Sequence, residues 1–92
     1  METAHLQKIS LDLQKAFLQL KTKSDVFSFL RDLLTEDEIV EFSLRFAIAK
    51  KLHAWQNYKE IEQKTWASST TIARVAKFLN GKFGGYRRVL KK

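Results

Sequence analysis

The chain has 92 residues, of which 45% are hydrophobic and 12% aromatic, and it contains neither cysteine nor proline. A domain of this length buries only about 60–65% of its unfolded surface, so its core is marginal without disulfides or a metal. The three glycines all lie between residues 81 and 85, whereas a β-sandwich or barrel needs turn residues at regular spacing. These counts exclude disulfide scaffolds and β architectures, and they predict a single all-α domain over residues 1–92.

The positive charge is concentrated in the C-terminal third. The chain has 17 Lys and Arg residues against 10 Asp and Glu, a net charge of +7. Residues 57–92 hold nine basic and two acidic residues and therefore carry this whole excess. Such a segment favours a polyanionic partner, either a nucleic acid or an anionic membrane surface. No apolar run in the first third is long enough for a signal peptide or membrane span, so we expect a cytoplasmic protein.

Three helices are predicted in the first two thirds of the chain. Apolar residues at three- and four-residue spacing predict a first helix over residues 3–22. A short second helix follows, with Ser24 as its N-cap. The sequence Thr35-Glu36-Asp37-Glu38 is a capping box, in which the first and last side chains each accept a backbone amide hydrogen bond. It predicts a third helix over residues 36–54.

The third predicted helix is apolar on two sides. One side carries Ile39, Phe42, Phe46 and Ala49, and the other carries Val40, Leu44, Ile48 and Leu52. A helix that is apolar all round must be covered on both sides, and a monomer of this size has too little mass to do so. Residues 1–56 are therefore predicted to be the dimerisation helices of an interlocked homodimer, which often has no stable folded monomer.

Residues 57–80 have the pattern of a helix-turn-helix. A short helix runs from Tyr58 to Thr65 with Ile61 as its inward anchor. After a turn, a second helix is capped by Ser68 or Ser69 and turns Ile72 and Val75 inward. Two short helices across such a turn, in the most basic part of the chain, predict a DNA-binding helix-turn-helix. A basic C-terminal helix or tail follows over residues 81–92.

Two positions depart from the usual helix-turn-helix pattern. The turn normally has glycine in a left-handed conformation, but this chain has Trp66 there. A bulky left-handed residue costs about 1–2 kcal/mol, so either the turn is reshaped or packing of the indole compensates for the strain. The fifth position of the unit usually holds a small residue, and here it is Glu62.

Several of these residues together resemble the Trp repressor family. The resemblance covers residues 26–90 and rests on the run from Leu33 to Glu38, then Arg45, Leu52, and the segment from Ile61 to Arg74. Leu79-Asn80-Gly81 followed by Gly84-Gly85-Tyr86 is similar to the Trp-repressor-like branch that has no assigned tryptophan response. The resemblance implies a six-helix Trp-repressor-like fold, an intertwined homodimer and sequence-specific repression of transcription at a palindromic operator in double-stranded DNA.

The expected DNA-contacting residues lie at the starts of the two helices of the helix-turn-helix. The first turn of the second helix offers hydroxyls, which bond to almost any base edge, and no bidentate reader such as arginine. By resemblance, the first helix touches the DNA backbone. There Glu62 either repels phosphate or accepts a hydrogen bond from a cytosine amino group. The predicted set is Tyr58, Lys59, Glu62, Ser69, Thr70, Thr71, Ala73 and Lys77. The hydroxyls also have a purely structural interpretation as helix caps.

A possible effector pocket follows from the resemblance alone. Arg45 and Arg74 match two arginines that sandwich the indole in tryptophan-responsive members, and guanidinium planes stack well on flat rings. By the same match, Leu34 and Thr35 line the pocket from the partner chain. In place of two small family residues this chain has Val75 and Phe78, and the latter is large enough to fill an indole site. We therefore expect no cofactor, and we do not favour tryptophan or another small effector.

Other function classes have less support. An enzyme is not expected, since the chain lacks cysteine and a glycine-rich phosphate loop, and His5 and His53 stand alone. For the same reason no metal is expected. A membrane-surface role is disfavoured because the basic tail after Gly81 is short and interrupted by glycine. An RNA-binding or protein-docking helical module remains the alternative, with aromatics such as Trp55 and Trp66 stacking on single-stranded bases.

Overall fold

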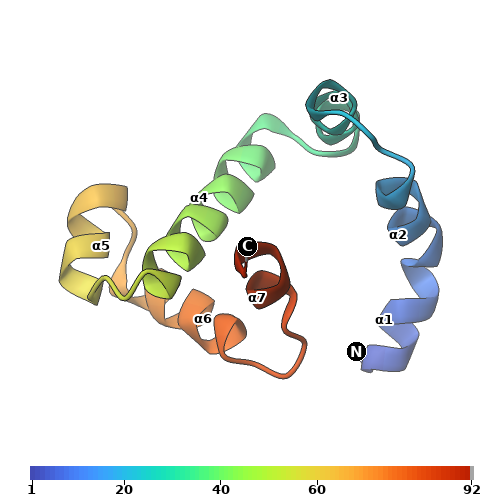
Figure 1. Ribbon diagram of the computed structural model, residues 1–92. Coiled ribbons are helices and arrows are strands. Elements are labelled where there is room, and N and C mark those ends of the chain that lie inside the picture. Colours follow the sequence, from blue (N-terminus) through green and yellow to red (C-terminus); the bar gives the residue numbers. More distant parts are fainter. Residues whose placement is uncertain (92) are drawn as a thin grey trace. The chain divides into compact units, whose positions relative to one another are not determined.

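The computed structural model describes residues 1–91, which form α-helices and no strand (Figure 1). The helices are α1 (Thr3–Ile9), α2 (Leu11–Leu18), α3 (Lys23–Leu33), α4 (Glu36–His53), α5 (Tyr58–Thr65), α6 (Ser69–Leu79) and α7 (Gly85–Leu90). The predicted all-α class is confirmed. The chain divides into two compact units, a first unit over Met1–Glu36 and a second unit that begins at Asp37. No helix in the described part of the chain is long and apolar enough to span a membrane.

The predicted continuous helix over residues 3–22 is wrong, because the chain breaks it at Ser10. This residue has φ −93° and ψ 7°, outside the helical region, and its hydroxyl donates to the Leu6 carbonyl at 2.7 Å. Serine side chains that bond to nearby backbone groups compete with the regular helical ladder. Two helices, α1 and α2, replace the one expected, so the described residues contain seven helices in place of the six predicted.

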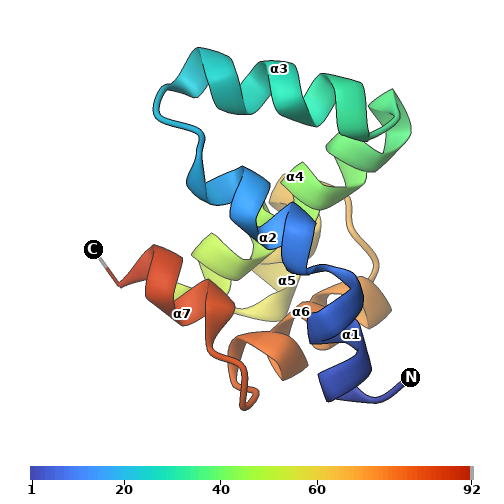
Figure 2. The same ribbon diagram turned by 90° about the vertical axis from the view of Figure 1, so that its right-hand side faces the viewer.

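The link between α2 and α3 corrects a second prediction, the N-cap at Ser24. Thr22 is extended, with φ −126° and ψ 160°, and its hydroxyl accepts from the Asp25 amide at 3.0 Å. Ser24 therefore lies inside the first turn of α3, and Thr22 is the cap. Figure 2 shows this extended link as the bend that separates α2 from α3.

The first unit has little internal packing. Its clearest contact is an edge-to-face pair between Phe17 of α2 and Phe29 of α3, whose ring centroids lie 5.3 Å apart. Within residues 1–36, all of which the structure describes, no side chain is buried. Leu18 is 85% exposed and Phe27 is 61% exposed. The apolar stripes that predicted these helices are therefore uncovered within the unit.

The second unit contains the core. Its buried side chains come from α4, α5, the α5–α6 turn and α6, and they are Ile48, Ala49, Ile61, Ala67, Ile72, Val75 and Leu79. Leu44, Leu52, Tyr86 and Leu90 pack against this cluster from α4 and α7. The structure confirms the predicted inward anchors of the helix-turn-helix, since Ile61 and Ile72 are fully buried and Val75 is nearly so. Figure 1 shows α5 and α6 at the carboxyl end of α4.

Arg87 joins α7 to the end of α6. Its guanidinium donates to the Leu79 carbonyl, and it also donates to the Gly81 carbonyl at 2.8 Å. Cations near a helix C-terminus satisfy its unpaired carbonyls. Gly84 has φ 70°, and a Cβ there would come within 3.2 Å of the Arg87 guanidinium. The glycine that resembled a branch-specific motif in the sequence thus allows the chain to turn closely around this arginine.

Candidate nucleic-acid interface and effector cavity

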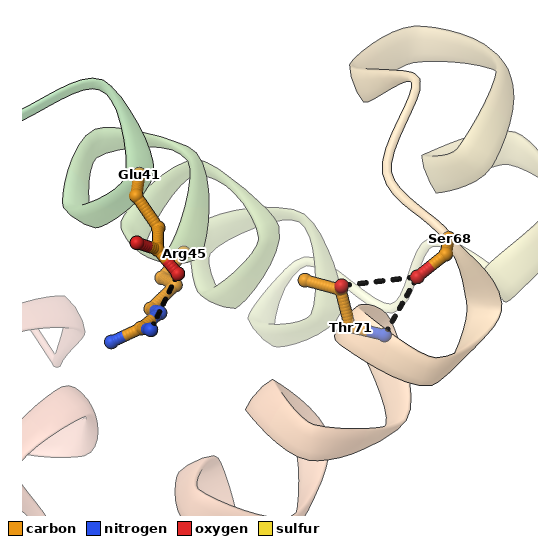
Figure 3. Close-up of polar contacts among 4 residues, drawn as sticks. All are labelled: Glu41, Arg45, Ser68 and Thr71. Carbon is orange, nitrogen blue, oxygen red and sulfur yellow. Dashed lines mark hydrogen bonds and ion pairs between the residues drawn. The ribbon is translucent and has the colours of Figure 1, made fainter. Parts of the chain in front are cut away.

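Both helices of the helix-turn-helix begin with a side-chain cap. The Asn57 side chain accepts from the Glu60 amide at 2.9 Å at the start of α5. At the start of α6, the Ser68 hydroxyl accepts from the Thr71 amide at 3.2 Å, as Figure 3 shows. Of the two serines that the sequence left open, Ser68 is therefore the cap. The bounds of α5 match those predicted from the sequence.

The outer face of α6 is open to solvent. Ser69, Ala73 and Lys77 recur at four-residue spacing and are exposed, while Ile72, Val75 and Leu79 on the inner side are buried. Each predicted contact residue on α5, namely Tyr58, Lys59 and Glu62, is also exposed. Thr70 is exposed as well, but Thr71 is half-buried, and its hydroxyl lies 3.0 Å from that of Ser68. Seven of the eight predicted DNA-contacting residues are thus available to a partner, and Thr71 contributes to the cap.

The turn keeps the left-handed residue that the pattern requires. Trp66 has φ 63° and ψ 11°, so the turn is not reshaped, and its side chain is 91% exposed, so packing within the chain does not compensate for the strain. Neither of the two alternatives considered from the sequence holds. The burial in this turn comes instead from the neighbouring Ala67, which is only 8% exposed.

A cavity of about 450 Å³ lies between α4, α6 and α7. It is lined by Glu41, Arg45, Thr70, Thr71, Arg74, Val75, Phe78 and Tyr86. The structure therefore brings together four of the six residues predicted for an effector pocket. The other two, Leu34 and Thr35, belong to the first unit and were expected to come from a partner chain. Phe78 is 49% exposed and lines the cavity without filling it.

Arg45 is paired within its own helix. Its Nη2 atom lies 2.7 Å from Oε1 of Glu41, one turn earlier on α4, as Figure 3 shows. Its guanidinium also lies over the Phe42 ring, 5.4 Å from the centroid. Because both charged side chains are partly exposed, the pair contributes only about 0–1 kcal/mol, but it orients the guanidinium. Sequence reasoning missed Glu41, although its four-residue spacing from Arg45 is a recognisable signal, and it missed Tyr86, for which no such signal exists.

Comparisons with known proteins agree on one family. Residues 9–92 match the model of the Trp repressor protein family. The chain belongs to the Trp repressor family. It is 36% identical over 81 residues to the uncharacterized protein YerC of Bacillus subtilis strain 168, covering 87% of this chain and 78% of that protein. The crystal structure of a TrpR-like protein from Eubacterium eligens ATCC 27750 superposes with a TM-score of 0.83 at 39% identity, covering 91% of this chain and 87% of that one.

Membership of the Trp repressor family gives the helix-turn-helix a function. The family consists of DNA-binding transcription regulators rather than enzymes, and this chain is accordingly a regulator of that class. The structural match also confirms the Trp-repressor-like fold predicted from the sequence. Among residues 1–91, no group of three or more His, Asp or Glu side chains is arranged to hold a metal ion.

Proposed function

We propose that the chain is a dimeric cytoplasmic repressor that binds a palindromic operator through α5 and α6 without requiring tryptophan. The observation that carries this proposal is the division of α6 into a buried inner side and an exposed outer side, which follows a capped first turn. Such a helix inserts its N-terminal residues into the major groove while the preceding helix crosses the backbone. The surplus of positive charge in this part of the chain supplies phosphate contacts.

The first unit supports the dimer. Residues 1–36 bury no side chain within the described structure, although they present large apolar residues such as Leu18 and Phe27. On α4, Val40 is 68% exposed and Phe42 is 45% exposed. Monomeric proteins rarely expose apolar surface on this scale, and a second copy of the chain would cover it. Two helix-turn-helix units related by a two-fold axis bind half-sites about one DNA turn apart, so the operator is expected to be a palindrome.

Direct base recognition is expected to be modest. Ser69 and Thr70 offer hydroxyls, which accept or donate to several base edges, and Ala73 offers a methyl group that suits thymine. None of these makes the bidentate contact by which arginine selects guanine. Lys59 and Lys77 add contacts that position the protein on phosphates without selecting a sequence.

The cavity beside α6 supports independence from tryptophan. Its Arg45 already has a carboxylate partner in Glu41, so the positive charge that would attract an amino acid carboxylate is partly neutralised. Val75 and Phe78 also add side-chain volume where tryptophan-responsive members have small residues. Both features reduce the gain from binding a zwitterionic indole.

The test is in vitro selection from a random duplex library at moderate salt, performed with and without L-tryptophan. We expect the same palindrome, with half-sites about one helical turn apart, to be enriched in both selections. Enrichment only in the presence of L-tryptophan would refute the ligand independence alone. Weak and salt-sensitive binding to every duplex, with no enrichment, would refute the sequence-specific operator.

One observation favours the alternative function as an RNA-binding module. Trp55 and Trp66 are 93% and 91% exposed, and aromatic side chains on the surface can stack on unpaired bases. The two residues lie at opposite ends of α5, however, and no item of the geometry joins them into one stacking platform. Competition between duplex DNA and single strands at equal nucleotide concentration separates the two functions, and we expect the duplex to compete better.

A further inference from the structure

The chain has two tryptophans, and they share an unusual environment. Trp55 has φ 64° and Trp66 has φ 63°, and no other non-glycine residue in the described range has a positive φ. Both side chains are more than nine-tenths exposed. Bulky residues avoid this conformation, and a large apolar ring in water adds no stability to the fold. The strain at these positions is therefore not compensated within the chain, which is the situation in which a function should be sought.

Hydrogen bonds on both sides of Trp66 hold its indole away from the core. The Trp66 amide donates to the Glu62 carbonyl at 2.9 Å. The Thr65 hydroxyl donates to the Ile61 carbonyl at 2.6 Å and accepts from the Ala67 amide at 3.2 Å. Because Ala67 is buried immediately after the turn, the backbone at Trp66 cannot rotate to bring the ring inward without exposing the core. The indole is consequently presented to the outside in a fixed position.

The surroundings of this indole indicate its partner. Trp66 directly follows α5 and stands two residues before Ser68, the cap of the helix proposed to enter the major groove. Lys59, Lys64 and Lys77 of the flanking helices are exposed and supply positive charge. An indole combines a flat apolar face with one N–H donor, which suits the sugar and phosphate groups along a DNA strand.

We infer that Trp66 contacts the duplex DNA backbone beside the groove that α6 enters, with its ring against deoxyribose and its N–H toward a phosphate. This inference rests on the proposed function and adds a contact residue to it. The contact is apolar and independent of base sequence, so it raises affinity for all duplexes and selects none. It also accounts for a bulky residue at a turn position that favours glycine.

Trp55 provides a control within the same chain. It has the same residue type, backbone conformation and exposure, but it precedes α5. There it lines a separate cavity with Leu79 and Asn80, which belong to the carboxyl end of α6. Since the amino end of α6 is the end proposed to enter the groove, Trp55 is expected to remain in water when DNA binds.

The experiment uses two variants of the full chain, Trp66→Gly and Trp55→Gly. Glycine favours the left-handed conformation, so we expect both variants to keep or raise the midpoint of chemical unfolding. Each variant also retains a single tryptophan as its only indole fluorophore. A mixed-sequence duplex is titrated into each at low salt. We expect the emission of Trp55→Gly, which reports Trp66, to change on binding, and that of Trp66→Gly to stay constant.

Affinity gives a second, independent measurement. Trp66→Gly should weaken binding to the mixed-sequence duplex about tenfold, the size expected for one desolvated aromatic contact. The slope of log K against log salt should not change, because no phosphate charge is lost. Trp55→Gly should bind as the wild type does. A structural role for Trp66 would instead lower the unfolding midpoint of its glycine variant.

The outcomes separate this inference from the proposed function. If the wild type binds the duplex but Trp66→Gly binds equally well and Trp66 emission is constant, the contact is overturned and the DNA-binding function stands. Equal emission changes at both tryptophans also overturn it, because they indicate a general change such as aggregation. If the wild type binds no duplex, both proposals are overturned. The emission of Trp55→Gly retains the native Trp66, so this measurement does not depend on the folding of Trp66→Gly.

Discussion

The two units of the chain bury their apolar residues to very different extents. The second unit contains all seven buried side chains of the described structure, drawn from α4, the α5–α6 pair and their turn, whereas residues 1–36 contain none. Both regions have the regular apolar spacing that predicts amphipathic helices. An apolar stripe thus predicts where a helix forms, but whether the stripe is covered depends on what else the chain provides. In the second unit the chain provides its own cover, and in the first it leaves that cover to a second copy.

The comparison predicts that a charge on the first unit will break the dimer while the second unit stays folded. Phe27→Glu places a carboxylate on a 61% exposed ring of α3. If that ring is buried between copies, the unpaired buried charge should weaken association by about 3–5 kcal/mol. Sedimentation velocity over a range of concentrations measures the change.

The matched control for this variant is Ser28→Glu, which adds the same charge at the neighbouring, exposed position. It should leave the dimer largely intact, because Ser28 contributes no apolar surface. A Phe27→Glu variant that sediments as the wild type would show that α3 is not at the interface between copies.

A second prediction compares one chemical change in both units. Ile72→Ala removes a fully buried side chain from α6, and such truncations cost about 2–5 kcal/mol of unfolding free energy. Ile9→Ala makes the same change on α1, where the side chain is 60% exposed within the chain. Chemical denaturation of each variant should be measured in the wild type and in the Phe27→Glu background.

The background decides between the two kinds of burial. Ile72→Ala should be equally destabilising in the dimer and in the Phe27→Glu monomer, since its core lies within one unit. Ile9→Ala should be destabilising only in the dimer, and by less. Equal costs for Ile9→Ala in both backgrounds would mean that α1 has a core within the monomer.

What the sequence predicted correctly was local or periodic. The bounds of α5, the buried anchors Ile61 and Ile72, and the start of α4 after its capping box all follow from interactions within a few residues. The break at Ser10 was missed because one hydroxyl-to-carbonyl hydrogen bond outweighed a continuous apolar stripe. A hydroxyl residue in a helical pattern signals such a break only weakly.

The candidate site shows the same limit. Arg45 and Arg74 were placed in a pocket by resemblance, and the structure brings them to one cavity. Tyr86 joins them from α7 only because Arg87 binds the end of α6, a contact between residues eight positions apart that has no periodic signature. The exposure of Trp66 was not predicted either, since a propensity argument assigns a cost to the conformation without saying where the ring goes.

The smallest expected effect separates the units by DNA binding. Lys59→Ala removes an exposed cation at the start of α5, where the chain is proposed to meet a phosphate. Counterion release contributes about −0.9 to the slope of log K against log salt per phosphate contact. A dimer that loses one contact per chain should therefore bind every duplex more weakly, with a slope shallower by about 2 units. The control is Lys15→Ala, which removes an exposed cation from α2 in the first unit and should leave the slope unchanged. An equal change in slope for both variants would place the first unit on the DNA as well, and the division of the chain into a dimerising region and a DNA-binding region would then be wrong.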